Sequence, residues 1–131
     1  MGKFLRIFFG CHCRPDRSFF WRGKQFPICA RCTGELIGIL GGIPIIFAFG
    51  YASLPLMALL MAPMVADGLI QLLTSYESTN LRRLLTGILF GIAFDSFLIH
   101  FHRTCVYAAG AIVKLFADDP AAVERAMDLF M

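Results

Sequence analysis

Three long apolar segments, separated by short polar stretches, dominate the middle of the chain. They cover residues 33–52, 53–73 and roughly 84–101. Each is close to the ~20 residues that a helix needs to cross the hydrocarbon core of a bilayer. The pattern therefore predicts an all-α, polytopic membrane protein with about three transmembrane helices.

The pattern changes on either side of this transmembrane helical bundle, which we delimit as residues 33–103. Residues 1–32 form a basic N-terminal cap that is rich in cysteine and histidine, and residues 104–131 form a C-terminal tail. Residues 104–117 are short for a span and are interrupted by Lys114. We expect them to form a packed half-helix or a continuation of the third helix, and a fourth membrane segment stays open.

The end of the tail carries the signals of a short amphipathic helix. Asp119 is a favourable N-cap and Pro120 suits the first helical position. Three apolar residues then share one stripe, namely Val123, Met127 and Phe130. We expect this helix to lie on the membrane or on a partner.

The composition excludes an ordinary soluble domain. Of the 131 residues, 58% are hydrophobic and only 16% are charged, and the mean hydropathy is +0.71. A soluble domain of this size needs a far more charged surface. The lipid bilayer is therefore the first partner that the sequence predicts.

Lysine and arginine are unevenly distributed around the predicted spans. In a three-span protein, the region before the first span and the loop after the second face one compartment, which the positive-inside rule identifies as the cytoplasm. The sequence thus predicts a multi-pass protein of the cell membrane with a cytoplasmic N-terminus and cysteine cluster. This topology and anionic headgroups account for the net charge of +3, and no nucleic acid is expected as a partner. Nine of the twelve basic residues lie in these two regions: Lys3, Arg6, Arg14, Arg17, Arg22, Lys24, Arg31, Arg82 and Arg83.

Glycines recur at every fourth position in two of the spans. Gly34, Gly38 and Gly42 follow this spacing in the first span, and Gly87 and Gly91 follow it in the third. Small residues at this spacing let the backbones of two lipid-embedded helices approach closely. We therefore predict that the first and third spans cross at short distance.

The N-terminal cap contains two pairs of cysteines, Cys11 with Cys13 and Cys29 with Cys32, in the spacing C-x-C-x15-C-x2-C. Two close pairs joined by a loop can supply the four ligands of tetrahedral zinc, at about 2.0 to 2.3 Å. A reducing cytoplasm favours metal over a disulfide in such a pattern. His12, inside the first pair, could replace Cys11 or Cys13, so the sequence predicts a zinc site without fixing its ligand set.

Two other interpretations of these cysteines stay open. A C-x-x-C pair at a helix start, Cys29 to Cys32 with Arg31 beside it, is also how a membrane thiol oxidoreductase lowers the pKa of a thiol. Alternatively, the cysteines are separate small residues in a loop. Cys105 is distant from the others and is predicted to be an ordinary core cysteine.

Polar residues at the predicted cytoplasmic ends of the spans form a second candidate site. Ionisable residues within spans are costly and are functional candidates by default. Helix capping and snorkelling arginines explain part of this pattern but not Asp67 with Gln71. Asp67 and Glu35 could form a carboxylate pair or neutralise Arg31 and Arg83. The candidate residues are Glu35, Asp67, Gln71, Ser78, Asn80, Arg82 and Arg83.

The outer end of the third span carries Asp95, His100 and His102. Asp95 and His102 are seven residues apart and share a helix face. A second metal or proton site is conceivable there, and a polar contact with the tail is favoured over it.

The motifs "CHCRPDRSFF", "FPICARCTGELIG", "DGLIQ" and "ESTNLRRLLTGILFG" together resemble the bacterial and archaeal membrane family DUF2085, a domain of unknown function. The resemblance runs from about residue 11 to residue 92. It implies a small integral membrane protein with a Cys-His segment, in which Cys11, His12, Cys29 and Cys32 are as plausible a ligand set as four cysteines. The signature positions that it implies are Cys11, His12, Pro15, Arg17, Ser18, Pro27, Cys29, Arg31, Cys32, Gly34, Asp67, Gly68, Gln71, Ser78, Thr79, Asn80, Arg82 or Arg83, Thr86 and Gly87.

The leading functional hypothesis is a metal-binding membrane protein, with zinc as the metal and a polar site near the cytoplasmic leaflet for an anionic small molecule or a lipid headgroup. A first alternative is a thiol-disulfide oxidoreductase that uses Cys29 and Cys32, with a quinone as acceptor. A second is a small transporter or an accessory subunit. Three spans are few for a monomeric transporter, so this last hypothesis requires a homo-oligomer or a membrane partner. The sequence leaves open whether the protein is an enzyme.

Overall fold

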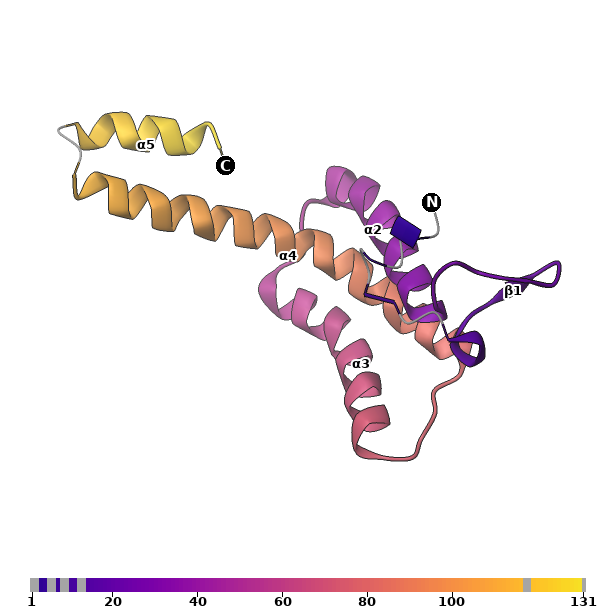
Figure 1. Cartoon of the computed structure of the whole chain (residues 1–131). Coiled ribbons are helices and arrows are strands. Elements are labelled where there is room, and N and C mark those ends of the chain that lie inside the picture. The colour runs from indigo at the N-terminus through magenta and orange to yellow at the C-terminus, as the bar shows by residue number, and fades with distance from the viewer. Residues whose placement is uncertain (1–2, 5–6, 8–9, 12–13, 117–118, 131) are drawn as a thin grey trace. The chain divides into compact units, whose positions relative to one another are not determined.

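A computed structural model describes residues 3–4, 7, 10–11, 14–116 and 119–130. Three helices in this part of the chain are long and apolar enough to cross a membrane (Figure 1). They are α2 (Ala30–Phe49), α3 (Leu54–Leu73) and α4 (Asn80–Lys114). The prediction of an all-α polytopic fold with three apolar helices is thus confirmed.

Helix α4 is longer than the sequence pattern predicted. It has 35 residues and is therefore about 52 Å long, whereas the hydrocarbon core of a bilayer is ~30 Å thick. Residues 104–114 continue the third helix, as one of the open possibilities had it. No proline occurs between residue 63 and residue 120, so nothing in the sequence forces the helix to end at residue 101.

Helices α2 and α4 pack backbone to backbone along their glycines. A Cβ atom on Gly34 would collide with the carbonyl oxygen of Leu84 and lie 3.1 Å from Gly87 Cα. A Cβ on Gly38 would likewise collide with the carbonyl oxygen of Ile88 and lie 2.9 Å from Gly91 Cα. The predicted close crossing of the first and third spans is confirmed.

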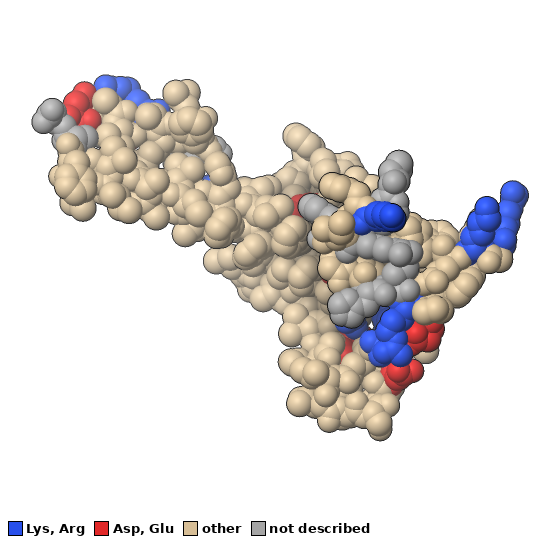
Figure 2. Space-filling view, in the orientation of Figure 1, with Lys and Arg blue, Asp and Glu red and all other residues tan. Residues whose placement is uncertain are grey.

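Most large apolar side chains on the spans point outward. Phe47 of α2 is 88% exposed and Leu72 of α3 is 79% exposed, and Asp67 is the one buried residue of α3. On the face seen in Figure 2, the surface over α3 is largely uncharged. Such a surface suits lipid, because tails are as apolar as the side chains that meet them.

The N-terminal cap contains a short 3-10 helix, η1 (Pro15–Arg17), and a two-stranded antiparallel hairpin. Strands β1 (Phe20–Trp21) and β2 (Lys24–Gln25) were not predicted from the sequence. Arg22 and Gly23 connect them with positive φ angles of 50° and 77°, as a tight hairpin turn requires.

Residues 97–131 form a separate compact unit, in which the C-terminal half of α4 meets α5 (Pro120–Asp128). Asp119 caps α5 as predicted, since its Oδ1 accepts hydrogen bonds from the backbone N–H groups of Ala121 and Ala122 at 3.0 and 3.2 Å. Met127 contacts Gly110 of α4. The apolar stripe of α5 therefore faces α4 of the same chain, while the expected contact of this helix with the membrane or a partner stays a prediction.

The prediction for Cys105 is wrong. Its side chain is exposed on α4 and does not belong to a core. It lies in the part of α4 beyond the glycine-lined crossing with α2, where the helix has no second span packed against it in its own unit.

Candidate functional site

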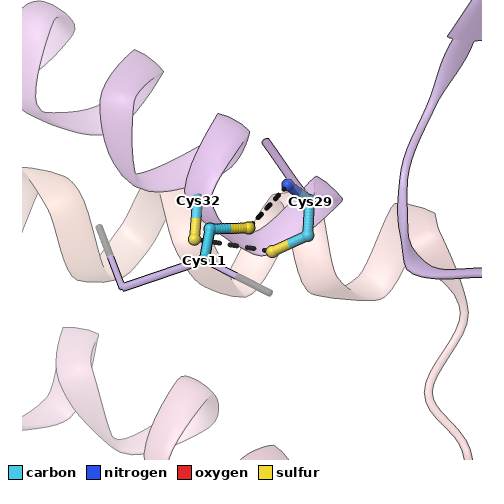
Figure 3. A group of neighbouring side chains, drawn as sticks. All are labelled: Cys11, Cys29 and Cys32. Carbon is cyan, nitrogen blue, oxygen red and sulfur yellow. Dashed lines mark hydrogen bonds between the residues drawn. The ribbon is translucent and has the colours of Figure 1, made fainter. Parts of the chain in front are cut away.

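The three described cysteines of the cap converge at the start of α2. Cys29 immediately precedes the helix and Cys32 lies in its first turn, while Cys11 comes from the segment before η1 (Figure 3). Their three Sγ atoms lie within 4.8 Å of one another. The backbone N–H of Cys29 donates a hydrogen bond to Cys11 Sγ at 3.1 Å, which holds the distant segment against the helix start.

Two of these thiols contact each other directly. Cys29 Sγ and Cys32 Sγ are 3.4 Å apart and share a hydrogen bond. This bond with Cys32, assisted by backbone N–H groups at the helix start, lowers the pKa of Cys29 to about 5. Cys29 is thus a thiolate at neutral pH, which is the form that binds metals and attacks disulfides.

The other predicted ligands, His12 and Cys13, lie outside the described residues. The sequence places one of them directly beside Cys11 and the other two positions after it. The described triad offers three thiol ligands for a soft or borderline metal, and a closed tetrahedral site takes four.

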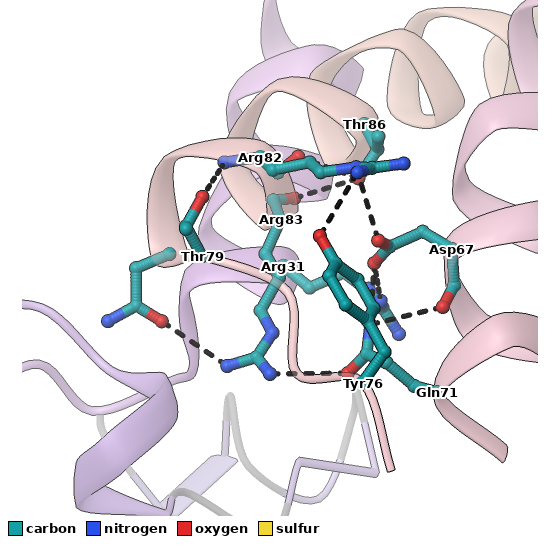
Figure 4. A network of polar contacts seen from close by, with 9 residues as sticks. Arg31, Asp67, Gln71, Tyr76, Thr79, Arg82, Arg83 and Thr86 are labelled. Carbon is teal, nitrogen blue, oxygen red and sulfur yellow. Dashed lines mark hydrogen bonds and ion pairs between the residues drawn. The ribbon is translucent and has the colours of Figure 1, made fainter. Parts of the chain in front are cut away.

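A polar network is centred on Asp67 of α3 and includes Arg31 from the start of α2 (Figure 4). The Asp67 side chain is fully buried, and its Oδ2 accepts hydrogen bonds from Arg31 Nη2 and Gln71 Nε2, both at 2.6 Å. Its Oδ1 lies 3.4 Å from Arg82 Nε, which is an ion-pair distance without a well-directed hydrogen bond. The carboxyl group of Asp67 is therefore paired with two guanidinium groups, those of Arg31 and Arg82.

The network continues from α3 into the start of α4. Arg83 Nη2 donates to Gln71 Oε1 at 3.2 Å, and Arg83 Nη1 donates to Asn80 Oδ1 at 3.4 Å. Arg82 Nη1 donates to the Tyr76 hydroxyl at 3.1 Å. These contacts join the end of α3, the following loop and the first turn of α4 into one cluster.

Five of the seven predicted polar-site residues meet in this network: Asp67, Gln71, Asn80, Arg82 and Arg83. Glu35 and Ser78 do not join it through a hydrogen bond or ion pair with the residues that the structure describes. Ser78 is buried, and its hydroxyl has no hydrogen-bond partner among those residues. Arg83 does not snorkel, because its side chain is 4% exposed.

Sequence reasoning missed part of the network. Tyr76 was not predicted, whereas Thr79 and Thr86 were expected only as signature positions of the family, and Thr79 caps α4 through a 3.3 Å bond from the N–H of Arg82. Arg31 was expected as the cation beside the thiols, as a charge to be neutralised and as a signature position, but not as a member of the polar site. It is the closer of the two cations paired with Asp67. The signal that could have found it is its position between Cys29 and Cys32, which fixes it at the helix start.

Arg31 links the two candidate sites. It stands in the same helical turn as the two cysteines and pairs with Asp67 from the neighbouring helix. The cap also meets α4 directly, since Asn80 Nδ2 donates to the backbone carbonyl of Ser18 at 3.4 Å. The cysteine triad and the Asp67 network are therefore parts of one assembled end of the bundle.

The polar residues that the sequence marked at the outer end of the third span have contacts within their own units. His102 Nε2 lies 3.1 Å from the carbonyl oxygen of Phe130, which is the favoured polar contact with the tail. Asp95 instead faces the backbone of Gly42 on α2.

Comparison with known protein families gives a match to the family described as "Predicted membrane protein (DUF2085)", over residues 11–97. The chain belongs to the DUF2085 family. A relative is an uncharacterized protein of Methanothermobacter thermautotrophicus, 38% identical over 92 residues that cover 67% of this chain and 83% of that protein. Another, from Methanocaldococcus jannaschii, is also uncharacterized and is 32% identical over 103 residues, which are 74% of this chain and 66% of the relative. No solved structure matches the chain.

The residues that match the DUF2085 family include the cysteine triad, the Asp67 network and the glycine-lined crossing of α2 and α4. The match begins at Cys11 and ends one residue after Ser96, where the first compact unit ends. It thus includes the cysteine triad and the whole Asp67 network, and it leaves out α5. What this DUF2085 protein shares with its family is therefore the three-helix bundle with its cap.

Proposed function

We propose that this DUF2085 protein binds zinc through its cap. The observation that carries the proposal is the convergence of Cys11, Cys29 and Cys32, whose Sγ atoms lie within 4.8 Å of one another. Tetrahedral zinc with Zn–S bonds of about 2.3 Å separates its sulfur ligands by about 3.8 Å, a spacing that this triad can meet with small side-chain shifts. His12 or Cys13 is the fourth ligand in this proposal, which makes the site closed and structural.

A structural metal would also stabilise the fold of the cap. The cap has about 30 residues, too few to bury a core of their own. Its buried residues include Ile28 and Ser18, and its strands have two residues each. A metal that ties Cys11 to the start of α2 would contribute the stability that such a small segment otherwise lacks.

The test is the metal content of the detergent-purified protein by elemental mass spectrometry, with free thiols counted in parallel. We expect about one zinc per chain, and its loss in Cys29→Ser. Cys105→Ser is the matched control, because this cysteine is exposed and distant from the triad in sequence. Absence of metal from the wild-type protein, or equal zinc in Cys29→Ser, would refute the proposal.

A second candidate is a thiol-disulfide oxidoreductase, favoured by the lowered pKa of Cys29 and its 3.4 Å contact with Cys32. In that function a substrate thiolate attacks Cys29 Sγ of a Cys29–Cys32 disulfide and releases the Cys32 thiolate. A second substrate thiolate then displaces Cys29 from the mixed disulfide, which forms the substrate disulfide and leaves both cysteines reduced. The reduced pair passes two electrons and two protons to a quinone, and this restores the Cys29–Cys32 disulfide. Two oxidised cysteines and no metal in the purified protein would decide for it.

We further propose that the Asp67 network binds the phosphate of a lipid headgroup or of another anionic small molecule. The network contains three guanidinium groups, those of Arg31, Arg82 and Arg83, and one carboxylate that is paired with the first two. One positive charge is in excess even if the half-buried Glu35 is counted as an anion. Arginine recognises phosphate with two parallel hydrogen bonds, and Arg82 is 52% exposed and so accessible to a ligand.

Native mass spectrometry of the same preparations tests this second part. We expect a retained phospholipid or phosphate adduct in the wild type that is lost in Arg82→Gln and kept in Arg125→Gln, whose arginine is exposed on α5. A lipid mass would identify a headgroup as the source, and a smaller adduct would identify a free anion. Equal adducts in both variants would contradict the assignment.

A further inference from the structure

Asp95 is an ionisable side chain in an otherwise uncharged part of the bundle. Lys, Arg, His, Asp and Glu are all absent from residues 36–66 and from residues 84–94. Those ranges contain most of α2, the α2–α3 loop, the first part of α3 and the part of α4 that crosses α2. These parts of the bundle therefore contribute no other charged or ionisable side chain of these five types.

The side chain points into the helix crossing. Asp95 is 9% exposed, and its Oδ2 has no hydrogen-bond partner among the described residues. A Cβ atom on Gly42 would collide with this same Oδ2. The next residue is also engaged, because the Ser96 hydroxyl accepts a 3.0 Å hydrogen bond from the backbone N–H of Ala52.

Among the residues that the structure describes, the elements packed around Asp95 bring it no cation. On the facing helix α2, Gly42 is flanked by apolar residues for four positions in both directions. The α2–α3 loop contributes Tyr51 as its titratable residue, and the nearest on α4 itself is His100, five residues further on; both have contacts of their own. The part of α3 that lines the adjacent cavity, at Leu56 and Leu60, is uncharged.

The contrast with Asp67 shows what is missing. Both aspartates are buried in the same bundle, but Asp67 has Arg31 at 2.6 Å and Gln71 at the same distance. An anionic carboxylate within a span requires such partners, and a neutral carboxylic acid does not. A metal cation is not the missing partner of Asp95, because hard cations need several oxygen ligands and the backbone of Gly42 occupies the adjacent space.

We infer that Asp95 binds a proton at neutral pH and is an intramembrane proton site at the crossing of α2 and α4. The proton removes a charge that the surrounding apolar side chains do not solvate. Asp67, at the cap end of the bundle, is the contrasting carboxyl group, because it is paired with Arg31. The inference does not depend on the zinc or anion proposals, since Asp95 touches neither site.

The protonated acid can be tested with dicyclohexylcarbodiimide, an apolar reagent that adds to protonated carboxyl groups within membranes. In vesicles that contain the full-length protein, we expect one adduct, located at Asp95 by peptide mass spectrometry. It should be absent from Asp95→Asn and should diminish as the pH is raised. Asp67 is the internal control and should stay unmodified. Equal modification of Asp67 and Asp95 would overturn the inference.

Infrared spectroscopy gives an answer that does not require the reagent to reach the site. The carbonyl band of a protonated carboxyl group, shifted by deuterium exchange, should be present in the wild type and missing from Asp95→Asn at neutral pH. Asparagine has nearly the same size as aspartic acid, so the helix crossing should be kept. Identical spectra in this region would overturn the inference.

Discussion

At the scale of single residues, Arg31 is the position on which both proposed sites depend. Its side chain pairs with Asp67 at 2.6 Å, and its backbone belongs to the turn that presents Cys29 and Cys32. Removing one partner of a buried ion pair leaves an uncompensated charge, which typically costs about 3 to 5 kcal/mol. Arg31 therefore connects the order of the cap to the position of α3.

The lowered pKa of Cys29 makes a pH-dependent reactivity measurable. In the metal-free protein, the rate of alkylation by iodoacetamide at Cys29 should stay nearly constant through the neutral range and fall to half near pH 5, where the thiolate becomes protonated. A cysteine of ordinary pKa, about 8.5, already loses most of its reactivity below pH 7. Peptide mass spectrometry resolves the rate at this one thiol.

The control for this experiment is the same protein unfolded in denaturant. Unfolding separates Cys29 from Cys32, so the pH profile should move to that of an ordinary thiol. An unchanged profile on unfolding would show that the folded contact between the two sulfurs is not its cause.

At the scale of secondary structure elements, the glycine pattern carried the most reliable information. It predicted that the first and third spans cross, because a four-residue repeat of glycine has a direct geometric meaning in lipid. The end of α4 could not be read from the same pattern, since hydropathy marks the part of a helix that suits lipid and not the point where its hydrogen bonding stops. The hairpin β1–β2 was missed because strands of two residues leave no alternating pattern.

Two neighbouring glycines of α2 provide a matched test of the crossing. Gly38→Ala should lower the free energy of unfolding by about 1 to 3 kcal/mol, because its Cβ would collide with the backbone of α4. Gly41→Ala should be neutral or stabilising by up to about 1 kcal/mol, because nothing lies within 4 Å of its Cβ and alanine favours helix. Unfolding in mixed detergent micelles measures both, and equal effects would contradict the crossing.

At the scale of the whole molecule, the sequence predicted most residues of the polar site but not which of them contact one another. The sequence marked Asp67, Gln71, Arg82 and Arg83 because polar residues near the ends of spans are costly. It offered Arg31 and Arg83 as charges that Asp67 or Glu35 could neutralise, whereas Asp67 pairs with Arg31 and Arg82, and Arg83 binds Gln71. Pairing across helices depends on their rotation about their own axes, which a nearly uniform apolar pattern does not specify.

Orientation in the membrane is a prediction from the distribution of Lys and Arg, and fusion reporters can measure it. With three spans and a cytoplasmic N-terminus, green fluorescent protein should be fluorescent when fused before residue 1, and alkaline phosphatase should be active when fused after residue 131. Fluorescence at both ends would instead mean an even number of crossings, with residues 104–114 returning across the membrane.

Helix α3 buries one residue, Asp67, along its 20-residue length. Its apolar side chains gain little by leaving lipid for protein, so its place beside α2 is set by ionic contacts at one end and by a four-residue loop at the other. Neutralising Asp67 should therefore let α3 move away from α2, as far as its two loops allow, while α2 and α4 stay packed together. Distances between spin labels on α2 and α3 should then broaden in Asp67→Asn, whereas those between α2 and α4 should not.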